Sequence, residues 1–189
     1  MLSGRAFESV LYLSVGTGIS CSLGVGGVPY AGARGLTGTM AISPLPRTGE
    51  GEGKAEPAPP TLEDPSSGPG LVARYNHATG RSVWKAEDVL QAATAGDAEA
   101  IRVARSGAEA LGAAVGVLVS TLDPAAVVVG GGLGLAGGLY WETFAASTRR
   151  HIWSEIHREL PILPGAKGHE AGVIGAAAAA WRRFSAPAS

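Results

Sequence analysis

The sequence contains little cysteine, little charge and no strongly apolar stretch of membrane length, and each shortage excludes a class of protein. With Cys21 as its one cysteine, the chain can form neither an intrachain disulfide nor a cysteine-based zinc cluster. Its 15 basic and 16 acidic residues leave no basic excess for binding nucleic acid. The first residues lack the basic start and apolar core of a signal peptide, and six glycines interrupt the uncharged stretch 124–141, unlike a membrane span. We therefore expect a cytoplasmic protein with neither a membrane nor a nucleic acid partner.

Glycine, by contrast, is abundant: 29 of the 189 residues are glycines, and they cluster beside short β-branched runs. Such clusters suit places where the backbone approaches a ligand or another strand closely. Short apolar and β-branched runs predict strands, and apolar residues at helical spacing predict helices. The predicted strands cover residues 9–15, 19–25, 125–129 and 162–163, and the predicted helices cover residues 61–75, 85–95, 97–122, a segment starting near Tyr140, and 171–184. This order of elements predicts an α/β fold.

Composition divides the chain into three parts. Residues 1–42 form a β-hairpin region, in which Gly26 and Gly27 make a two-residue turn. Residues 43–60 are rich in proline, glycine and charge with few apolar side chains, so we expect a flexible insert. Residues 61–189 hold the helices and the remaining strands, and we expect them to complete the same domain.

The turn after the first strand is a candidate phosphate site. It consists of Gly16, Thr17 and Gly18, and successive amides in such a turn can point their N–H groups into one concave spot that suits a phosphate. The threonine hydroxyl adds a donor. The alternative is a plain hairpin that uses glycine at left-handed positions, and the turn by itself leaves both open.

A second glycine-rich turn follows the buried strand at 125–129. Gly130, Gly131 and Gly132 stand at the carboxyl end of that strand, where ligands bind in open α/β sheets. Three residues without side chains would allow a flat base or a ribose to lie on the backbone. The alternative is close packing between a helix and the strand.

A series of short motifs runs along the chain in a fixed order, and each is weak by itself. They are residues 13–20 (LSVGTGIS), 27–35 (GVPYAGARG), Leu62-Glu63, Ser67-Gly68, Gly96-Asp97, 122–124 (LDP), 127–132 (VVVGGG) and 171–176 (AGVIGA). The ordered set resembles the ROK family (repressor, open reading frame, kinase) over almost the whole chain.

The resemblance implies an actin-like fold (ribonuclease H-like, ASKHA), with this chain as the C-terminal half of a two-domain sugar kinase. Such a kinase transfers the γ-phosphoryl group of ATP, with Mg²⁺, to a hexose hydroxyl. By position, the turn at 16–18 matches a phosphate loop and the glycines at 130–132 match residues on the adenosine side. Glu63 matches a glutamate that reaches a sugar hydroxyl; the alternative is a surface carboxylate favoured at a helix start.

The sequence also departs from the family pattern. Thr39 and Ile42 stand where relatives carry the glutamate and histidine of a Gly-Glu-x-Gly-His segment. The insert at 43–60 replaces a cysteine-rich zinc loop, so we expect no structural zinc and assign no metal ligand. The family's Asp-x-Gly-x-Thr loop is absent, and so is its Asn-Asp pair with the catalytic base, because the one asparagine, Asn76, precedes His77. We therefore assign no catalytic residue to the chain and expect it to lack kinase activity without a missing N-terminal domain.

Three functions stay open at this point, and one of them is a stand-alone nucleotide-binding remnant that binds ATP without turnover. The other two are more specific. The first is the nucleotide-binding part of a glucokinase-like hexose kinase, with ATP, a hexose and the N-terminal domain as partners. The second is the sugar-sensing domain of a ROK transcriptional repressor, which has the same architecture. The zinc cysteines are usual in the repressors, so their absence from this chain favours the kinase. Without the N-terminal domain, we expect apolar surface around Val10, Leu11 and Leu13 to be exposed and the chain to self-associate, with a homodimer as one form.

Overall fold

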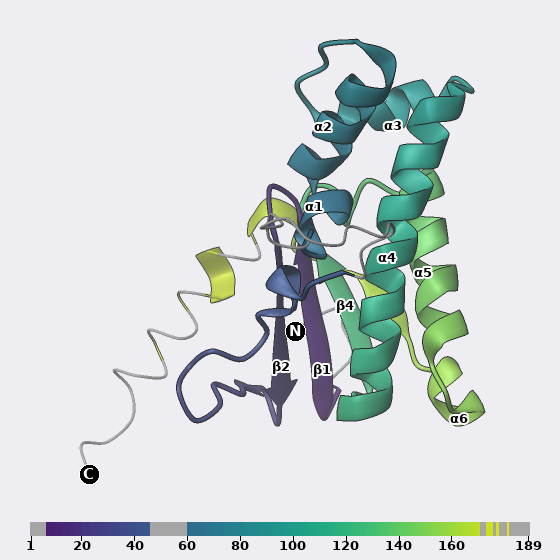
Figure 1. Cartoon of the computed structure of the whole chain (residues 1–189). Helices are drawn as coiled ribbons and strands as arrows, with labels where there is room; N and C mark the ends of the chain where they lie inside the picture. The colour runs from purple at the N-terminus through teal and green to yellow at the C-terminus, as the bar shows by residue number, and fades with distance from the viewer. Residues whose placement is uncertain (1–6, 46–59, 171–172, 176, 178–180, 182–189) are drawn as a thin grey trace, which may run out of the picture.

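The computed structural model describes residues 7–45, 60–170, 173–175, 177 and 181. Its sheet has five strands in the order β3-β2-β1-β4-β5. β1 is antiparallel to β2 and parallel to β4, β3 is antiparallel to β2, and β5 is parallel to β4. The elements in Figure 1 are the strands β1 (Ser9–Val15), β2 (Ile19–Val25), β3 (Val28–Pro29), β4 (Ala126–Gly130) and β5 (Ile162–Pro164), the helices α1 (Glu63–Ser66), α2 (Gly68–Thr79), α3 (Ala86–Thr94), α4 (Ala98–Leu122), α5 (Gly138–His151) and α6 (Glu155–Arg158), and short 3-10 helices at Met40–Ile42 and Gly168–Glu170.

The longer strands are those that the sequence predicts. β1 and β2 have the predicted bounds, and β4 is shifted by one residue. The two-residue turn is confirmed as well, since Val25 pairs with Val28 and both Gly26 and Gly27 have positive φ, 57° and 75°. All five residues of β4 are buried, which explains its continuous β-branched run. The mixed sheet with its helices confirms the α/β class.

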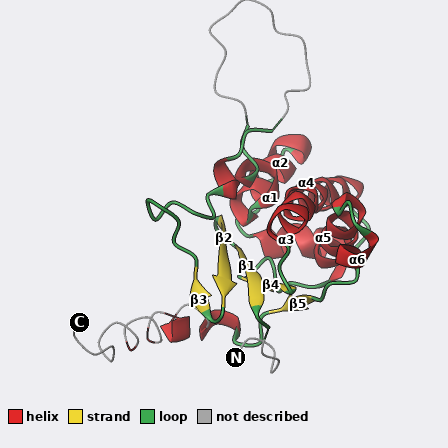
Figure 2. Cartoon of the chain, turned by 90° about the horizontal axis from the view of Figure 1, so that it is seen from below, coloured by secondary structure: helices red, strands yellow, loops and turns green. Residues whose placement is uncertain are grey.

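The helices pack on one face of the sheet. Figure 2 shows α1 to α6 gathered on the same side of the strands. Leu11, Leu13 and Val15 alternate along β1, are at most 1% exposed, and belong to the same core cluster as the buried residues of α4. The expectation that Leu11 and Leu13 lie exposed without a second domain is therefore wrong, because the chain's own helices cover them.

Helix α4 lies at the centre of the helical layer. It has the length and the mean hydropathy, 1.3, of a membrane-crossing helix, but half of its most apolar window is buried within the domain. That burial is typical of the core helix of a globular domain. A Cβ at Gly107 would lie 2.3 Å from the Pro65 carbonyl oxygen, and one at Gly112 would lie 2.6 Å from the Phe144 carbonyl oxygen. The close contacts of α4 with α1 and α5 therefore require these two glycines.

One predicted helix is interrupted. Residues 61–75, predicted as a single helix, form α1 and the greater part of α2, separated at Ser67. Ser67 has extended dihedral angles, and its hydroxyl accepts a hydrogen bond from the Gly70 amide at 3.2 Å, so it caps α2. The Gly68 amide donates to the carbonyl of Gly16 at 2.8 Å. Because the helix begins anew at this point, its first amide can bond to the first glycine turn.

Most of the predicted insert at 43–60 and of the predicted helix at 171–184 lies outside the described residues. The two ends of the insert are described, and they pair with each other: the Leu45 amide donates to the Pro60 carbonyl at 2.7 Å, and the Leu62 amide donates to the Ser43 carbonyl at 2.9 Å. The insert therefore leaves and rejoins the domain at one place, directly before α1.

Candidate functional site

The two glycine-rich turns lie side by side at one end of the sheet. β1 and β4 are parallel neighbours, so the turns that follow them emerge together. The Gly134 amide donates to the Val15 carbonyl at 3.0 Å, and a Cβ at Gly16 would lie 3.7 Å from the Gly132 amide nitrogen. A cleft of about 440 Å³ opens beside them. Its described lining consists of Gly16, Thr17, Gly68, Pro69, Val72, Ala73, Trp84, Lys85, Ala86, Glu87, Gly132 and Leu133.

The first turn presents an exposed threonine and exposed backbone to solvent. Its Gly16 amide donates to the Gly18 carbonyl at 3.0 Å, whereas the amides of Thr17 and Gly18 make no backbone hydrogen bond within the described residues. Neither glycine has a positive φ, so the alternative of a hairpin with left-handed glycines does not account for them. Gly16 and Thr17 line the cleft, and the amide and hydroxyl of Thr17 are donors that suit an anion.

The N-terminus of α2 also faces the cleft. Gly68 and Pro69, its first two residues, line the cavity. The Gly68 amide already donates to Gly16, the Gly70 amide donates to Ser67, and Pro69 has no N–H, so the helix dipole is what favours a negative charge there. Lys85 adds a positive side chain to the same cleft. This end of the cavity therefore suits a phosphate group.

The three glycines after β4 have two different roles: two of them pack against β1 and one lines the cleft. Cβ atoms at Gly130 and Gly131 would lie 2.3 Å from the Tyr12 hydroxyl and the Val15 carbonyl oxygen, respectively. Gly131 also has a φ of 84°. Gly132 lines the cleft, and a Cβ there would meet nothing within 4 Å. Gly130 and Gly131 thus hold the loop against β1, and an adenosine contact for any of the three stays a prediction.

Glu63 has a structural role that the sequence does not reveal. As the first residue of α1, it accepts a hydrogen bond on Oε2 from the Ile19 amide at 2.7 Å. A Cβ at Gly18 would lie 2.9 Å from that same oxygen, so a larger residue there would push the carboxylate out of its present position. Glu63 is not among the described residues that line the cleft. It fastens the start of β2 beside the turn, and its contact with a sugar stays a prediction.

Replacing Glu63 by alanine is expected to destabilise the domain by about 1–3 kcal/mol, because it leaves the amide of the buried Ile19 without an acceptor. Glu63→Gln keeps an acceptor and should lose less. Glu142, exposed on α5, provides the control, and Glu142→Ala should change stability by less than about 0.5 kcal/mol. Urea unfolding measures all three variants, and equal losses for Glu63→Ala and Glu142→Ala would contradict the proposed fastening role.

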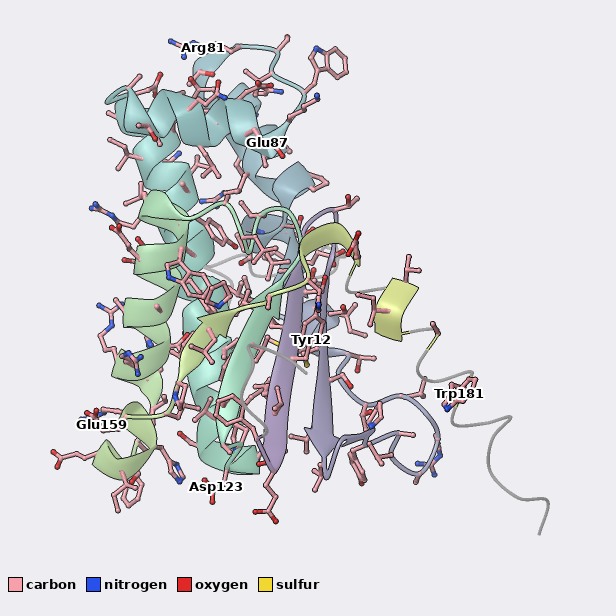
Figure 3. All side chains as sticks on the ribbon, turned by 180° about the vertical axis from the view of Figure 1, so that it is seen from behind. Tyr12, Arg81, Glu87, Asp123, Glu159 and Trp181 are labelled. Atoms are coloured by element: carbon pink, nitrogen blue, oxygen red, sulfur yellow. The ribbon has the colours of Figure 1, made fainter. Side chains whose placement is uncertain are left out.

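Sequence reasoning missed the wall of the cleft at the start of α3. Trp84, Lys85 and Glu87 contribute an indole ring and both signs of charge to the lining. Figure 3 shows Glu87 and Arg81 at the helical end of the molecule, opposite the end that carries Asp123. A tryptophan within a polar segment between two helices was the available signal, but no spacing in the sequence connects it with the glycine turns.

Within the described part of the chain, no group of three or more His, Cys, Asp and Glu side chains is placed to hold a metal ion. The prediction of no structural zinc rests on the missing cysteines and is not tested by this finding. The described lining of the cleft includes one carboxylate, Glu87, and one hydroxyl, Thr17.

Comparison with models of known protein families shows to which family the chain belongs. The model described as the ROK family matches residues 3–183. The chain belongs to the ROK family. This confirms the resemblance drawn from the ordered motifs, and the actin-like fold predicted from it agrees with the solved ROK structures.

Three relatives show how much of a ROK protein the chain represents. It is 32% identical over 183 residues to a bifunctional enzyme NanE/NanK of Brucella melitensis, a match that covers 94% of this chain and 32% of the relative. It is 29% identical to an N-acetyl-D-glucosamine kinase of Pasteurella multocida, covering 91% of this chain and 59% of the relative. The crystal structure of a ROK hexokinase from Thermus thermophilus matches with a TM-score of 0.81 and 30% identity, covering 97% of this chain and 61% of that one. The ROK chain described here therefore spans less than two thirds of the length of each.

Proposed function

We propose that this ROK chain is the nucleotide-binding part of an ATP-dependent, glucokinase-like hexose kinase, acting with a second domain that supplies the catalytic base. The observation that carries the proposal is the shared cleft, because Thr17 and Gly132 come from turns far apart in the chain and line one cavity. Kinases and a hexokinase among the relatives near 30% identity favour this function over the sugar-sensing domain of a repressor.

The polyphosphate of ATP is assigned to the phosphate end of the cleft. The amide and hydroxyl of Thr17 and the Lys85 side chain are the groups available there, and the dipole of α2 adds a favourable field. Phosphoryl transfer depends mainly on positioning and on stabilising charge around the transferred group. The Thr17 amide and hydroxyl would position a phosphate, and the Lys85 side chain would stabilise its charge.

Mg²⁺ would enter this site with the nucleotide. The ion needs six oxygen ligands and is usually held by substrate phosphates, waters and one or two carboxylates. The described lining offers the Thr17 hydroxyl and the Glu87 carboxylate, a set that fits an ion bound mainly through phosphates. When bound, Mg²⁺ neutralises charge on the phosphate oxygens.

The hexose is assigned to the other side of the first turn. Glu63 lies against Gly18 and Ile19, while Thr17 lines the nucleotide cleft. A sugar hydroxyl at Glu63 and a phosphate at Thr17 would therefore approach the same three-residue turn from two directions. This arrangement would place the acceptor hydroxyl and the γ-phosphoryl group near each other, as transfer requires.

The 189-residue chain is expected to bind MgATP and to have no kinase activity, because neither Asp-x-Gly-x-Thr nor Asn-Asp occurs in it. Isothermal titration calorimetry measures the binding, and a coupled assay with glucose and N-acetylglucosamine measures turnover. Gly132→Val should weaken MgATP binding by about tenfold, or about 1.4 kcal/mol, by filling the cleft. The fold should tolerate it, since nothing lies within 4 Å of the added Cβ.

Gly175→Val is the matched control, because a Cβ at Gly175 also meets nothing within 4 Å and this residue is not part of the described lining. The control should bind MgATP like the unaltered chain. No binding by the unaltered chain, or equal binding by Gly132→Val, would contradict the nucleotide site. Robust ATP-dependent phosphorylation would instead contradict the assignment of the base to a second domain.

A further inference from the structure

The rim of the cleft carries an unusual aromatic side chain. Trp84 lines the cavity, yet its side chain is 87% exposed. Tryptophan is on average well buried in folded proteins, because its large ring gains much from leaving water. Trp84 sits in the segment 80–85 between α2 and α3. The segment therefore holds an indole beside the cleft without covering it.

One side of this segment is held by a single asparagine. The Asn76 side chain donates to the Val83 carbonyl at 2.9 Å and accepts from the Val83 amide at 2.9 Å. Both backbone groups of the residue before Trp84 are therefore bound by one amide side chain on α2. On the other side, the Lys85 amide donates to the Asp88 carboxylate at 3.2 Å at the start of α3.

The beginning of the segment is held as well. Arg81 forms an ion pair with Asp97 at 2.9 Å, lies 5.6 Å above the Tyr75 ring centre, and also donates to the Tyr75 hydroxyl. The same Asp97 accepts from the Tyr75 hydroxyl at 3.0 Å and caps α4. The backbone that carries Trp84 is thus ordered by the fold before any ligand binds, which reduces the entropy cost of binding.

We propose that Trp84 stacks on the base of the nucleotide whose phosphates lie at the turn 16–18, an inference that rests on the proposed function. An indole offers a flat face for a base, and stacking of this kind tolerates any base because each has such a face. The cleft is continuous from Thr17 and the start of α2 to Trp84, so one ligand can contact both ends. Trp84 therefore binds the base without selecting between adenine and guanine.

The test compares ligands with and without a base. Trp84→Ala is expected to weaken MgATP and MgGTP binding by about tenfold each, and to leave inorganic tripolyphosphate binding unchanged, in isothermal titration calorimetry of the full chain. Trp84→Phe keeps an aromatic face and should lose about threefold or less. Trp153, also 87% exposed and outside the described lining, is the matched control, and Trp153→Ala should bind all three ligands normally.

Fluorescence gives an independent readout. MgATP should quench the tryptophan emission of the unaltered chain and of Trp153→Phe, and the quenching should be lost in Trp84→Phe. If the unaltered chain binds MgATP and Trp84→Ala binds it equally well, the stacking role is wrong while the nucleotide site stands. An equal loss of tripolyphosphate binding would also overturn it, since the ring would then support the cleft and not the base. A chain that binds no nucleotide contradicts the proposed function itself.

Discussion

Gly131→Ala is expected to destabilise the domain by about 3 kcal/mol and to abolish MgATP binding with it. Gly131 has a φ of 84°, in a region that costs other residues about 1–2 kcal/mol. The added Cβ would also lie 2.3 Å from the Val15 carbonyl oxygen, a backbone atom of β1 that cannot rotate away, and overpacking of this kind costs about 1–3 kcal/mol. Relief requires the loop to move away from β1, which breaks the hydrogen bond from Gly134 to Val15 and displaces Gly132 from the cleft.

The next residue supplies the control for this prediction. Gly132→Ala adds the same methyl group where nothing lies within 4 Å, so its stability should stay within about 0.5 kcal/mol of the unaltered chain. Urea unfolding followed by circular dichroism measures both variants. Equal stabilities of the two variants would mean that the loop does not approach β1 closely. The assignment of Gly131 to packing and of Gly132 to the cleft would then be wrong.

Gly112→Ala is expected to lower the free energy of unfolding by about 2 kcal/mol. On an exposed helix face, the same change stabilises by about 1 kcal/mol, because alanine is the better helix former. Here the added Cβ would lie 2.6 Å from the Phe144 carbonyl oxygen and 2.9 Å from the Thr148 amide nitrogen, both backbone atoms of α5. The two helices must then separate, and Phe144, which is 2% exposed, loses part of its packing.

Val117→Ala provides the comparison on the same helix. Val117 is 59% exposed, and its replacement should change stability by less than about 0.5 kcal/mol. Thermal unfolding of both variants measures the difference. A more stable Gly112→Ala would show that helix propensity outweighs the contact, and that α4 and α5 lie farther apart than described.

Apolar and β-branched patterns were sufficient to predict the longer strands, but apolar periodicity did not predict the break between α1 and α2. Apolar and β-branched runs bounded by glycine are short-range signals, and they placed β1 and β2 correctly. Across residues 61–75 the apolar positions alone predict one continuous helix. Ser67 as the N-cap and Pro69 in the first turn are local signals that a new helix begins at Gly68. The hydrogen bond from the Gly68 amide to the Gly16 carbonyl, far away in the sequence, then ties this helix start to the first turn. The apolar pattern alone is therefore insufficient here, because cap and proline residues decide where one helix ends and the next begins.

By itself, the sequence determined that this is an α/β domain of the ROK family with two glycine-rich turns and without the family's catalytic base motif. Periodicity, motif order and missing residue types are properties of the chain that need no coordinates. Only the tertiary structure decided that the two turns share one cleft, that Gly131 packs while Gly132 faces the cavity, and that Trp84 stands at its rim. The reason is that these relations depend on the parallel pairing of β1 with β4 and on the packing of α2 and α3, which contacts between distant residues establish.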